Sequence, residues 1–270
     1  MTLPFKLRHF VVGCLTACLL VLLFLLSYLY SPWWPNEETE IDNPVRIGSI
    51  PLPEGYERKY DDSYADYLRN LPLMPTDSVV RTFDGDTSRL AQSFCYRVID
   101  KPIISQYEQC ADVCIHLRAD YLYSQRRFFS IHFDDTQYHT MRYWRGARHW
   151  WYEKYLREVF GLANSQSMVQ EMPQRKLEDI HVGDVFVYDS ESREDSNLGH
   201  AILVADLAEN KDTGSKIVLL VQGSTPACSM HILRNESDSI LSPWFLLDET
   251  ADTLDFGYAR YGREELRYWP

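Results

Sequence analysis

The hydrophobic pattern begins with a run, residues 10–30, that contains no charged side chain. As a helix rising about 1.5 Å per residue, this run spans roughly 30 Å, the thickness of the hydrocarbon core of a bilayer. Lys6 and Arg8 precede the run and acidic residues follow it, which predicts an N-terminus in the cytoplasm. We therefore expect a cytoplasmic tip (1–9), a transmembrane anchor (10–30), an acidic tether (31–44) and a single body on the periplasmic side (45–270).

Two alternatives to an uncleaved anchor remain open. The segment Leu15-Thr16-Ala17-Cys18 resembles a bacterial lipoprotein signal, in which the cysteine is lipidated after cleavage, but the apolar run continues well beyond Cys18. A cleaved signal peptide has a shorter apolar region that ends in a small-residue cleavage site. All three interpretations place the body outside the cytoplasm.

Between residues 45 and 175 the spacing of apolar residues is mainly helical. The strongest pattern runs from Cys110 to about residue 126, where Ala111, Cys114, Leu117 and Tyr121 recur at helical intervals. A second amphipathic helix is predicted from about residue 149 to 161, and a short helix capped by Ser63 at residues 64–71. Alternating segments predict strands at 78–84, 94–99 and 129–134.

After residue 175 the pattern changes to short β-rich runs. Polar, turn-forming segments separate these runs, which are 180–188, 200–207, 216–223 and 229–233. Because short links join successive strands and no helical pattern intervenes, we predict an antiparallel sheet. The body is therefore expected to be one α+β domain, with an N-terminal helical part packed on a C-terminal antiparallel sheet.

Composition and charge limit the possible partners and cofactors. The chain holds 27 Lys and Arg against 39 Asp and Glu, a formal net charge of −12, and such a surface disfavours nucleic acid, whose binding depends on neutralised phosphates. The cysteines outside the apolar run could form two disulfides; they are Cys95, Cys110, Cys114 and Cys228. Since no CxxC pair is present and the histidines at 132, 139 and 149 follow no ligand spacing, we expect no metal and no cofactor.

Cys110 is the main candidate for chemistry, because it begins the strongest predicted helix. The positive end of a helix favours a thiolate, and a cysteine nucleophile also needs a histidine and a polar side chain that orients it. His200 begins one predicted strand and Gln222 lies near the end of the next, so we predict Cys110 as nucleophile, His200 as base and Gln222 as orienting residue. Gln109 could donate a hydrogen bond to an oxyanion beside the Cys110 backbone N–H.

Each of these residues also has a structural explanation that the sequence leaves open. Cys110 could be a core residue, since free cysteine is often buried, and we assign Cys114, one helical turn further along, to the core. His200 could bind a backbone carbonyl at the edge of a strand. Gln222 could stabilise the turn that follows its strand.

The segment RYWRGARHWW (142–151) mixes arginine with tryptophan. Aromatic faces with cationic neighbours can bind sugars or anionic polymers, so Trp144 and Arg145 are candidates for substrate binding. The alternative is a packing role, in which arginine stacks on aromatic rings between two parts of the body.

Several segments of the body resemble an uncharacterised bacterial family, domain of unknown function number 4846. They cover most of residues 45–247 and are GYER, YADYLRNLPL, QCADVCIHLRADYLYSQ, YWRGAR, HVGDVFV, GHAILVADLA, LLVQGSTPACSMHIL and SPWF. This resemblance implies a cell-envelope setting but no particular activity.

A more distant resemblance concerns the segments GDVFVY, GHAILVAD and VQGSTPA. They are similar to the catalytic half of NlpC-type and CHAP-type cell-wall cysteine peptidases and amidases. In those papain-like families a Gly-Asp strand precedes the histidine strand, and the following strand carries the orienting residue. The resemblance implies a papain-like fold and the same three roles for Cys110, His200 and Gln222.

These observations together predict a membrane-anchored envelope protein with a papain-like body. Its expected function is that of a cysteine peptidase or amidase, with the stem peptides of peptidoglycan as a possible substrate. The alternative is a binding module on the same scaffold, which recognises a glycan or an envelope protein without catalysing a reaction.

Overall fold

The computed structural model of the chain describes residues 45–59, 62–144, 149–191, 193 and 198–270, together with Leu19 and Val21. The predicted tip, anchor and tether (1–9, 10–30 and 31–44) lie outside the described residues, apart from these two positions. Within the described part of the chain, no helix is both long enough and apolar enough to cross a bilayer.

The helices cluster in the first two thirds of the body, as the apolar spacing predicts. The α-helices are α2 (Ser63–Arg69), α3 (Arg89–Ser93), α4 (Cys110–Ser124), α5 (His149–Val159) and α6 (Ser165–Glu171). Short 3-10 turns are η1 (Ile47–Ser49), η2 (Phe128–Ser130), η3 (Leu177–Asp179) and η4 (Arg263–Glu265). The helix predicted to begin at Cys110 is confirmed as α4.

The strands form one large antiparallel sheet and two small hairpins. The large sheet has the order β12 (Leu266–Arg267), β5 (Val185–Tyr188), β6 (His200–Asn210), β7 (Lys216–Gln222), β8 (His231–Leu233) and β2 (Cys95–Val98), while β1 (Tyr56–Arg58) pairs with β6 and β9 (Phe245–Leu246) with β7. The hairpins are β3 (His132–Asp134) with β4 (Thr140–Arg142), and β10 (Thr253–Asp255) with β11 (Arg260–Gly262). The mixed α+β class, with helices first and an antiparallel sheet later, is therefore confirmed.

Both faces of the large sheet are covered. On one face α4 approaches β7 so closely that a Cβ atom at Gly223 would lie 2.7 Å from Cγ2 of Val113. On the other face the C-terminal segment supplies Phe256, whose ring centroid lies 5.1 Å from that of Phe186 on β5. Because neither face meets solvent, β6 and β7 are nearly continuous apolar runs and show no alternation.

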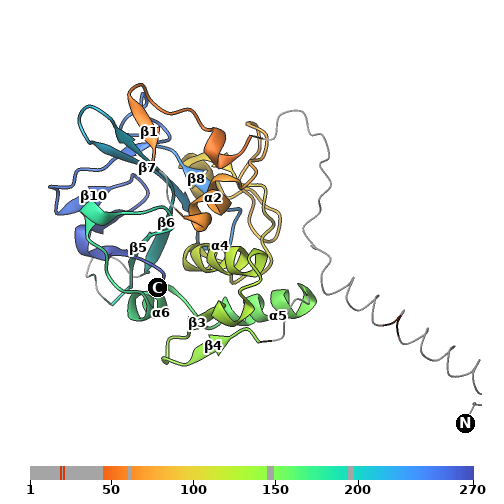
Figure 1. The fold of residues 1–270 in the computed structure, drawn as a ribbon. Helices are drawn as coiled ribbons and strands as arrows, with labels where there is room; N and C mark the ends of the chain where they lie inside the picture. The colour runs from red at the N-terminus through yellow and green to blue at the C-terminus, as the bar shows by residue number, and fades with distance from the viewer. Residues whose placement is uncertain are drawn as a thin grey trace, which may run out of the picture.

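Within the segment between α4 and β5, α6 packs beside β5 of the sheet, whereas α5 forms a further layer. Figure 1 shows the sheet on one side of α4 and α5 on the other. The hydroxyl of Tyr152 on α5 donates to Oδ1 of Asp120 on α4 at 2.5 Å, and its ring stacks on Tyr123 with centroids 4.1 Å apart. Helix α4 is therefore buried between the sheet and α5. Its polar side chains can be buried there because they have hydrogen-bond partners, such as Nδ1 of His116, which lies 2.6 Å from Oε1 of Glu108.

Two local sequence predictions were wrong. The cap of α2 is Asp62, whose carboxylate accepts from the backbone N–H of Tyr64 at 2.9 Å, so Ser63 is the first helical residue. Residues 78–84 form no strand beyond isolated bridges such as Arg81 to Thr87. Alternation in this segment reflects contacts with a small apolar cluster that contains Val80 and Cys228.

Candidate active site

Cys110 is the first residue of α4, and its sulfur lies where the ends of the central strands meet that helix. The backbone N–H of Gln109 donates to Oδ2 of Asp112 at 3.0 Å and fixes the first turn. The Cys110 side chain is almost buried, with 7% exposed. This burial raises the pKa of the thiol, although backbone N–H groups, that of Ala201 foremost, act in the opposite direction. The resting group is therefore a thiol.

The contact with the Ala201 backbone N–H places the sulfur at the start of β6, where His200 is the preceding residue. Bonded geometry puts the Cα atom of a residue about 2.4 Å from the next backbone nitrogen, so the backbone of His200 lies close to the sulfur. Among the described residues, however, no hydrogen bond joins the Cys110 sulfur to the His200 ring. The pairing of Cys110 as nucleophile with His200 as base therefore stays a prediction.

His200 and Gln222 form the contact that the sequence predicts. Nε2 of His200 lies 2.9 Å from Oε1 of Gln222, one strand away on β7. The chain of contacts then continues, because Nε2 of Gln222 lies 3.2 Å from Nε2 of His231, its cross-strand partner on β8. Nδ1 of His231 in turn lies 2.9 Å from the carbonyl oxygen of Ser229.

These four groups fix the direction of every proton in the chain. A carbonyl oxygen accepts only, so Nδ1 of His231 donates to Ser229 and Nε2 of His231 must accept from the amide of Gln222. The Gln222 carbonyl then faces His200 and accepts from its Nε2–H. Nδ1 of His200 is therefore left unprotonated, with a lone pair that can take a proton.

Burial keeps both histidines neutral. It lowers the pKa of His200 to about 4, although the hydrogen bond to Gln222 acts in the opposite direction. It also lowers the pKa of His231 to about 4, against the effect of the bond to Ser229. At neutral pH His200 is thus an uncharged imidazole, the form that can act as a general base.

Gln109 is positioned by the loop after β7. Its Oε1 accepts from Oγ1 of Thr225 at 2.9 Å. With its carbonyl oxygen occupied in this way, the amide nitrogen of Gln109 is the group available as a donor next to Cys110. This placement is compatible with the predicted oxyanion role.

The structure adds two residues that the sequence did not indicate. The ring of Tyr258 lies 4.9 Å from that of His200, and its hydroxyl bonds Oγ of Ser224 at 3.0 Å. Burial raises the pKa of Tyr258, and a charge on Cys110 raises it further, so Tyr258 is close to both members of the predicted pair. Tyr258 sits in a short link between two hairpin strands, where no sequence pattern signals a site. His231, by contrast, lies within a run predicted to be a strand.

The remaining cysteines are structural in their surroundings. Cys114 is fully buried, and its sulfur contacts the carbonyl oxygen of Cys110 at 3.7 Å, which agrees with its assignment to the core. All four described cysteines are free, so neither of the two possible disulfides is present. Among the described residues, no group of three or more His, Cys, Asp or Glu side chains is arranged to hold a metal ion.

The predicted substrate-binding residues lie on a different part of the molecule. Trp144 is 68% exposed and lines a pocket between β4 and α5, whose lining includes neither Cys110 nor His200. Arg145 lies outside the described residues. Among the described residues, therefore, nothing joins Trp144 to the Cys110 site.

Comparison with known proteins gives a family and no activity. The model of the family described as domain of unknown function (4846) matches residues 48–150 and 144–267. No curated protein matches the chain, and no solved structure matches it either.

Proposed function

Since the chain belongs to the family of domain of unknown function 4846, whose description names no activity, we propose a function from the site alone: a cysteine hydrolase that cleaves an amide bond. The observation that carries the proposal is the hydrogen-bond chain from Ser229 to His200. It leaves a basic Nδ1 on the residue that precedes Ala201, whose backbone N–H contacts the Cys110 sulfur.

In the proposed reaction, Nδ1 of His200 takes the proton of the Cys110 thiol while the sulfur attacks the amide carbonyl carbon. The carbonyl oxygen becomes an oxyanion and accepts hydrogen bonds from the Cys110 N–H and the amide of Gln109. As the C–N bond breaks, His200 gives the proton to the leaving amine. A water molecule deprotonated by His200 then attacks the thioester, and the thiol regains its proton.

The pKa directions favour a concerted proton transfer. Burial raises the pKa of Cys110 and lowers that of His200 to about 4, so the resting pair is a neutral thiol and a neutral imidazole. Attack and proton transfer must then occur together, whereas a preformed thiolate–imidazolium pair would separate them.

A cysteine at a helix N-terminus beside an antiparallel histidine strand is the arrangement of papain-like enzymes, and we extend the proposal to that fold group. The NlpC-type and CHAP-type peptidases, which the segments around His200 and Gln222 resemble, suggest an envelope substrate. We propose that residues 10–30 anchor the chain in the membrane, that the body lies on the periplasmic side, and that the substrate is a stem peptide of peptidoglycan.

One observation favours a second candidate, a binding module without catalysis. Cys110 and His200 are each only 7% exposed, and a substrate carbonyl must reach the sulfur. On this alternative the polar chain through Gln222 specifies the packing of three strands, and ligands bind elsewhere on the surface.

Hydrolysis assays with matched cysteine variants separate the two candidates. The full chain is incubated with peptidoglycan fragments that differ in their amide bonds, and new amines are counted by mass spectrometry. Cys110→Ala should abolish cleavage while Cys114→Ala, at a buried position one turn away, should retain it if the protein folds. Folded wild-type protein that cleaves none of the fragments would favour the binding module.

A further inference from the structure

Exposed aromatic side chains and cationic side chains occur together where β4 and α5 meet, around a pocket whose lining includes neither Cys110 nor His200. A pocket of about 390 Å³ opens there between the strand and the helix. Its floor consists of Met141, Tyr155 and Val159, and Tyr155 is held in place because its hydroxyl donates to the Met141 carbonyl at 2.9 Å. The pocket therefore has a rigid, largely apolar base.

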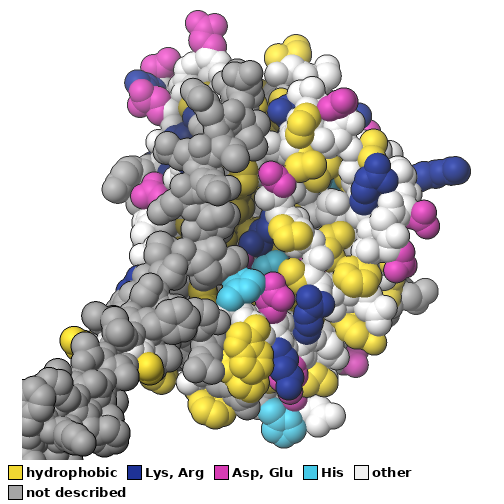
Figure 2. All heavy atoms as spheres, turned by 90° about the vertical axis from the view of Figure 1, so that its right-hand side faces the viewer, with side chains coloured by type: hydrophobic (Ala, Val, Ile, Leu, Met, Phe, Trp, Pro, Cys, Tyr) yellow, Lys and Arg dark blue, Asp and Glu magenta, His cyan; other side chains and the backbone are white. Residues whose placement is uncertain are grey.

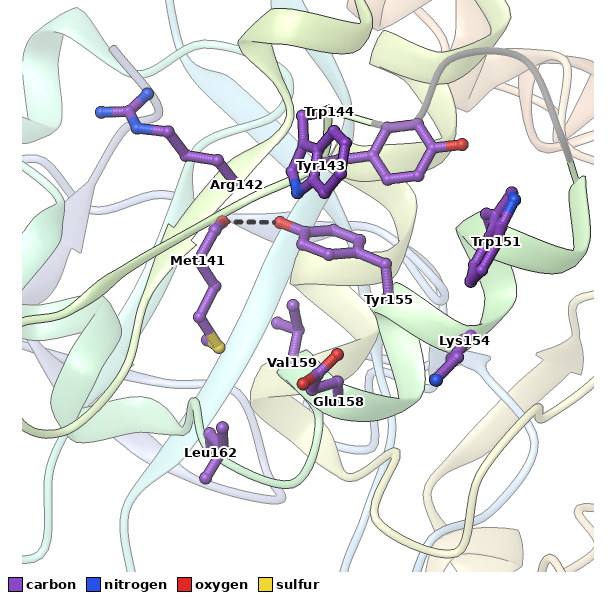
Figure 3. A pocket seen from close by; sticks show the side chains of 10 residues that line it. All are labelled: Met141, Arg142, Tyr143, Trp144, Trp151, Lys154, Tyr155, Glu158, Val159 and Leu162. Atoms are coloured by element: carbon purple, nitrogen blue, oxygen red, sulfur yellow. Dashed lines mark hydrogen bonds between the residues drawn. The ribbon is translucent and has the colours of Figure 1, made fainter.

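Aromatic faces form one wall of this pocket. Figure 3 shows the ring of Trp144 above that of Tyr155 on the floor, with Trp151 nearer the start of α5. The side chain of Trp144 is 68% exposed. Such exposure is unusual, because tryptophan has a large apolar surface that is mostly buried in folded proteins. A flat ligand can cover this wall and remove that surface from water.

Charged side chains stand at the rim. Arg142, Lys154 and Glu158 line the pocket, and no ion pair joins any of them to another described residue. Two cations against one carboxylate is a local excess of positive charge on a chain whose formal net charge is −12. Figure 2 shows the side of the molecule on which α5 lies in Figure 1, and on this side basic side chains lie next to hydrophobic ones.

From this combination we propose that the pocket binds an acidic oligosaccharide. The apolar face of a pyranose ring stacks on aromatic side chains, which accounts for the wall. A carboxylate on the sugar would be recognised by Lys154, and the Glu158 carboxylate would accept hydrogen bonds from ring hydroxyls. The volume of about 390 Å³ suits a short saccharide, since ligand pockets in proteins commonly measure 300–1,000 Å³.

Charge argues against the other ligands that aromatic walls recognise. An aromatic cage for a quaternary ammonium group attracts a cation to the ring faces, and two unpaired cations at the rim would repel it. A purely apolar ligand would leave Arg142, Lys154 and Glu158 without a partner. The acidic sugar is the class that uses both the wall and the rim.

The test compares two tetrasaccharides of equal ring number on the full chain, followed by tryptophan fluorescence and calorimetry. One is a hyaluronan tetrasaccharide, which carries carboxylates, and the other is neutral N-acetylchitotetraose. The acidic probe should bind at least ten times more tightly than the neutral one. Equal binding of the two probes would overturn the assignment of the charge, and binding of neither would overturn the proposal.

Matched variants locate the binding. Trp144→Ala should weaken the acidic probe tenfold or more, while Phe129→Ala, an 85% exposed aromatic residue outside this pocket, should have no effect. Lys154→Gln should weaken the acidic probe selectively, and Lys211→Gln, a surface lysine elsewhere, should not. Unchanged binding in both Trp144→Ala and Lys154→Gln would overturn the site. Cys110→Ala should bind the acidic tetrasaccharide as tightly as the wild type does, so this test does not depend on the proposed hydrolase activity.

Discussion

Replacing Gln222 by Glu changes the chemistry of the buried hydrogen-bond chain and keeps its shape. A carboxylate can still accept from Nε2–H of His200, but it cannot donate to Nε2 of His231, which lies 3.2 Å from the amide nitrogen in the wild type. The lone pair of His231 would then face a negative oxygen. This repulsion is removed if His231 takes up a proton at Nε2, because Nε2–H can then donate a hydrogen bond to the carboxylate.

The size of the effect follows from Coulomb's law. With charge centres ~4.5 Å apart and an effective dielectric constant of about 20, a carboxylate stabilises an imidazolium by ~4 kcal/mol. Each factor of ten in proton affinity corresponds to about 1.4 kcal/mol, so the pKa of both histidines should rise well above the value of about 4 that burial imposes in the wild type.

This shift changes how stability depends on pH. In the wild type both histidines have folded-state pKa values below the unfolded value of 6.5, so the unfolded chain binds protons more readily and stability falls as pH drops from about 6.5 to 4. The loss amounts to ~3 kcal/mol for each histidine. In Gln222→Glu the folded state also binds protons, and this loss on acidification should largely disappear.

Urea denaturation of the full chain at several pH values between 4 and 7.5 measures the difference. Histidine-selective NMR on the same samples reports the two pKa values directly. Gln137→Glu, at an exposed position, controls for the added charge. If Gln222→Glu loses stability on acidification as steeply as the wild type, with both histidines unchanged, the assigned direction of the hydrogen bonds is wrong.

Two further predictions concern other parts of the body. Burial raises the pKa of Glu171 to about 7 from its usual 4.5, so the folded state holds the proton more tightly and stability is lost as pH rises between these values. Glu171→Gln should therefore be more stable than the wild type at pH 8 by up to ~3 kcal/mol. An unchanged denaturation midpoint would contradict this prediction. A Cβ at Gly223 would lie 2.7 Å from Val113, so Gly223→Ala should push the start of α4 away from the sheet. The variant should lose ~1–3 kcal/mol of unfolding free energy and change the rate of Cys110 labelling. Gly161→Ala, whose added Cβ would lie 3.5 Å from its nearest neighbour, should change neither the stability nor the labelling rate.

The sequence predicted the elements that carry the site because their signals are local. The helix beginning at Cys110 follows from apolar residues three and four positions apart. The strand that begins at His200 and the strand that ends at Gln222 follow from apolar runs that contain several β-branched residues. Antiparallel pairing of neighbouring strands then brings Gln222 next to His200, as observed at 2.9 Å.

The parts that the sequence did not predict depend on contacts between distant segments. Tyr258 reaches His200 only because the C-terminal segment returns to the start of β6. His231 was within a predicted strand, but its contact with Gln222 depends on the register of β8 on β7. The choice of Asp62 over Ser63 as helix cap was a choice between adjacent residues that both favour this position.

The proposal that Cys110 is activated by His200 is tested most directly by the rate at which each cysteine of the folded full chain reacts with iodoacetamide, read by mass spectrometry. Cys110 should react faster than Cys114, and His200→Ala should slow it about tenfold or more, since a general base typically contributes a factor of 10²–10⁴. The exposed residue change His139→Ala should leave the rate unaltered. Reaction of Cys110 no faster than that of Cys114, or at the same rate in His200→Ala as in the wild type, would show that Cys110 is a core residue and no nucleophile.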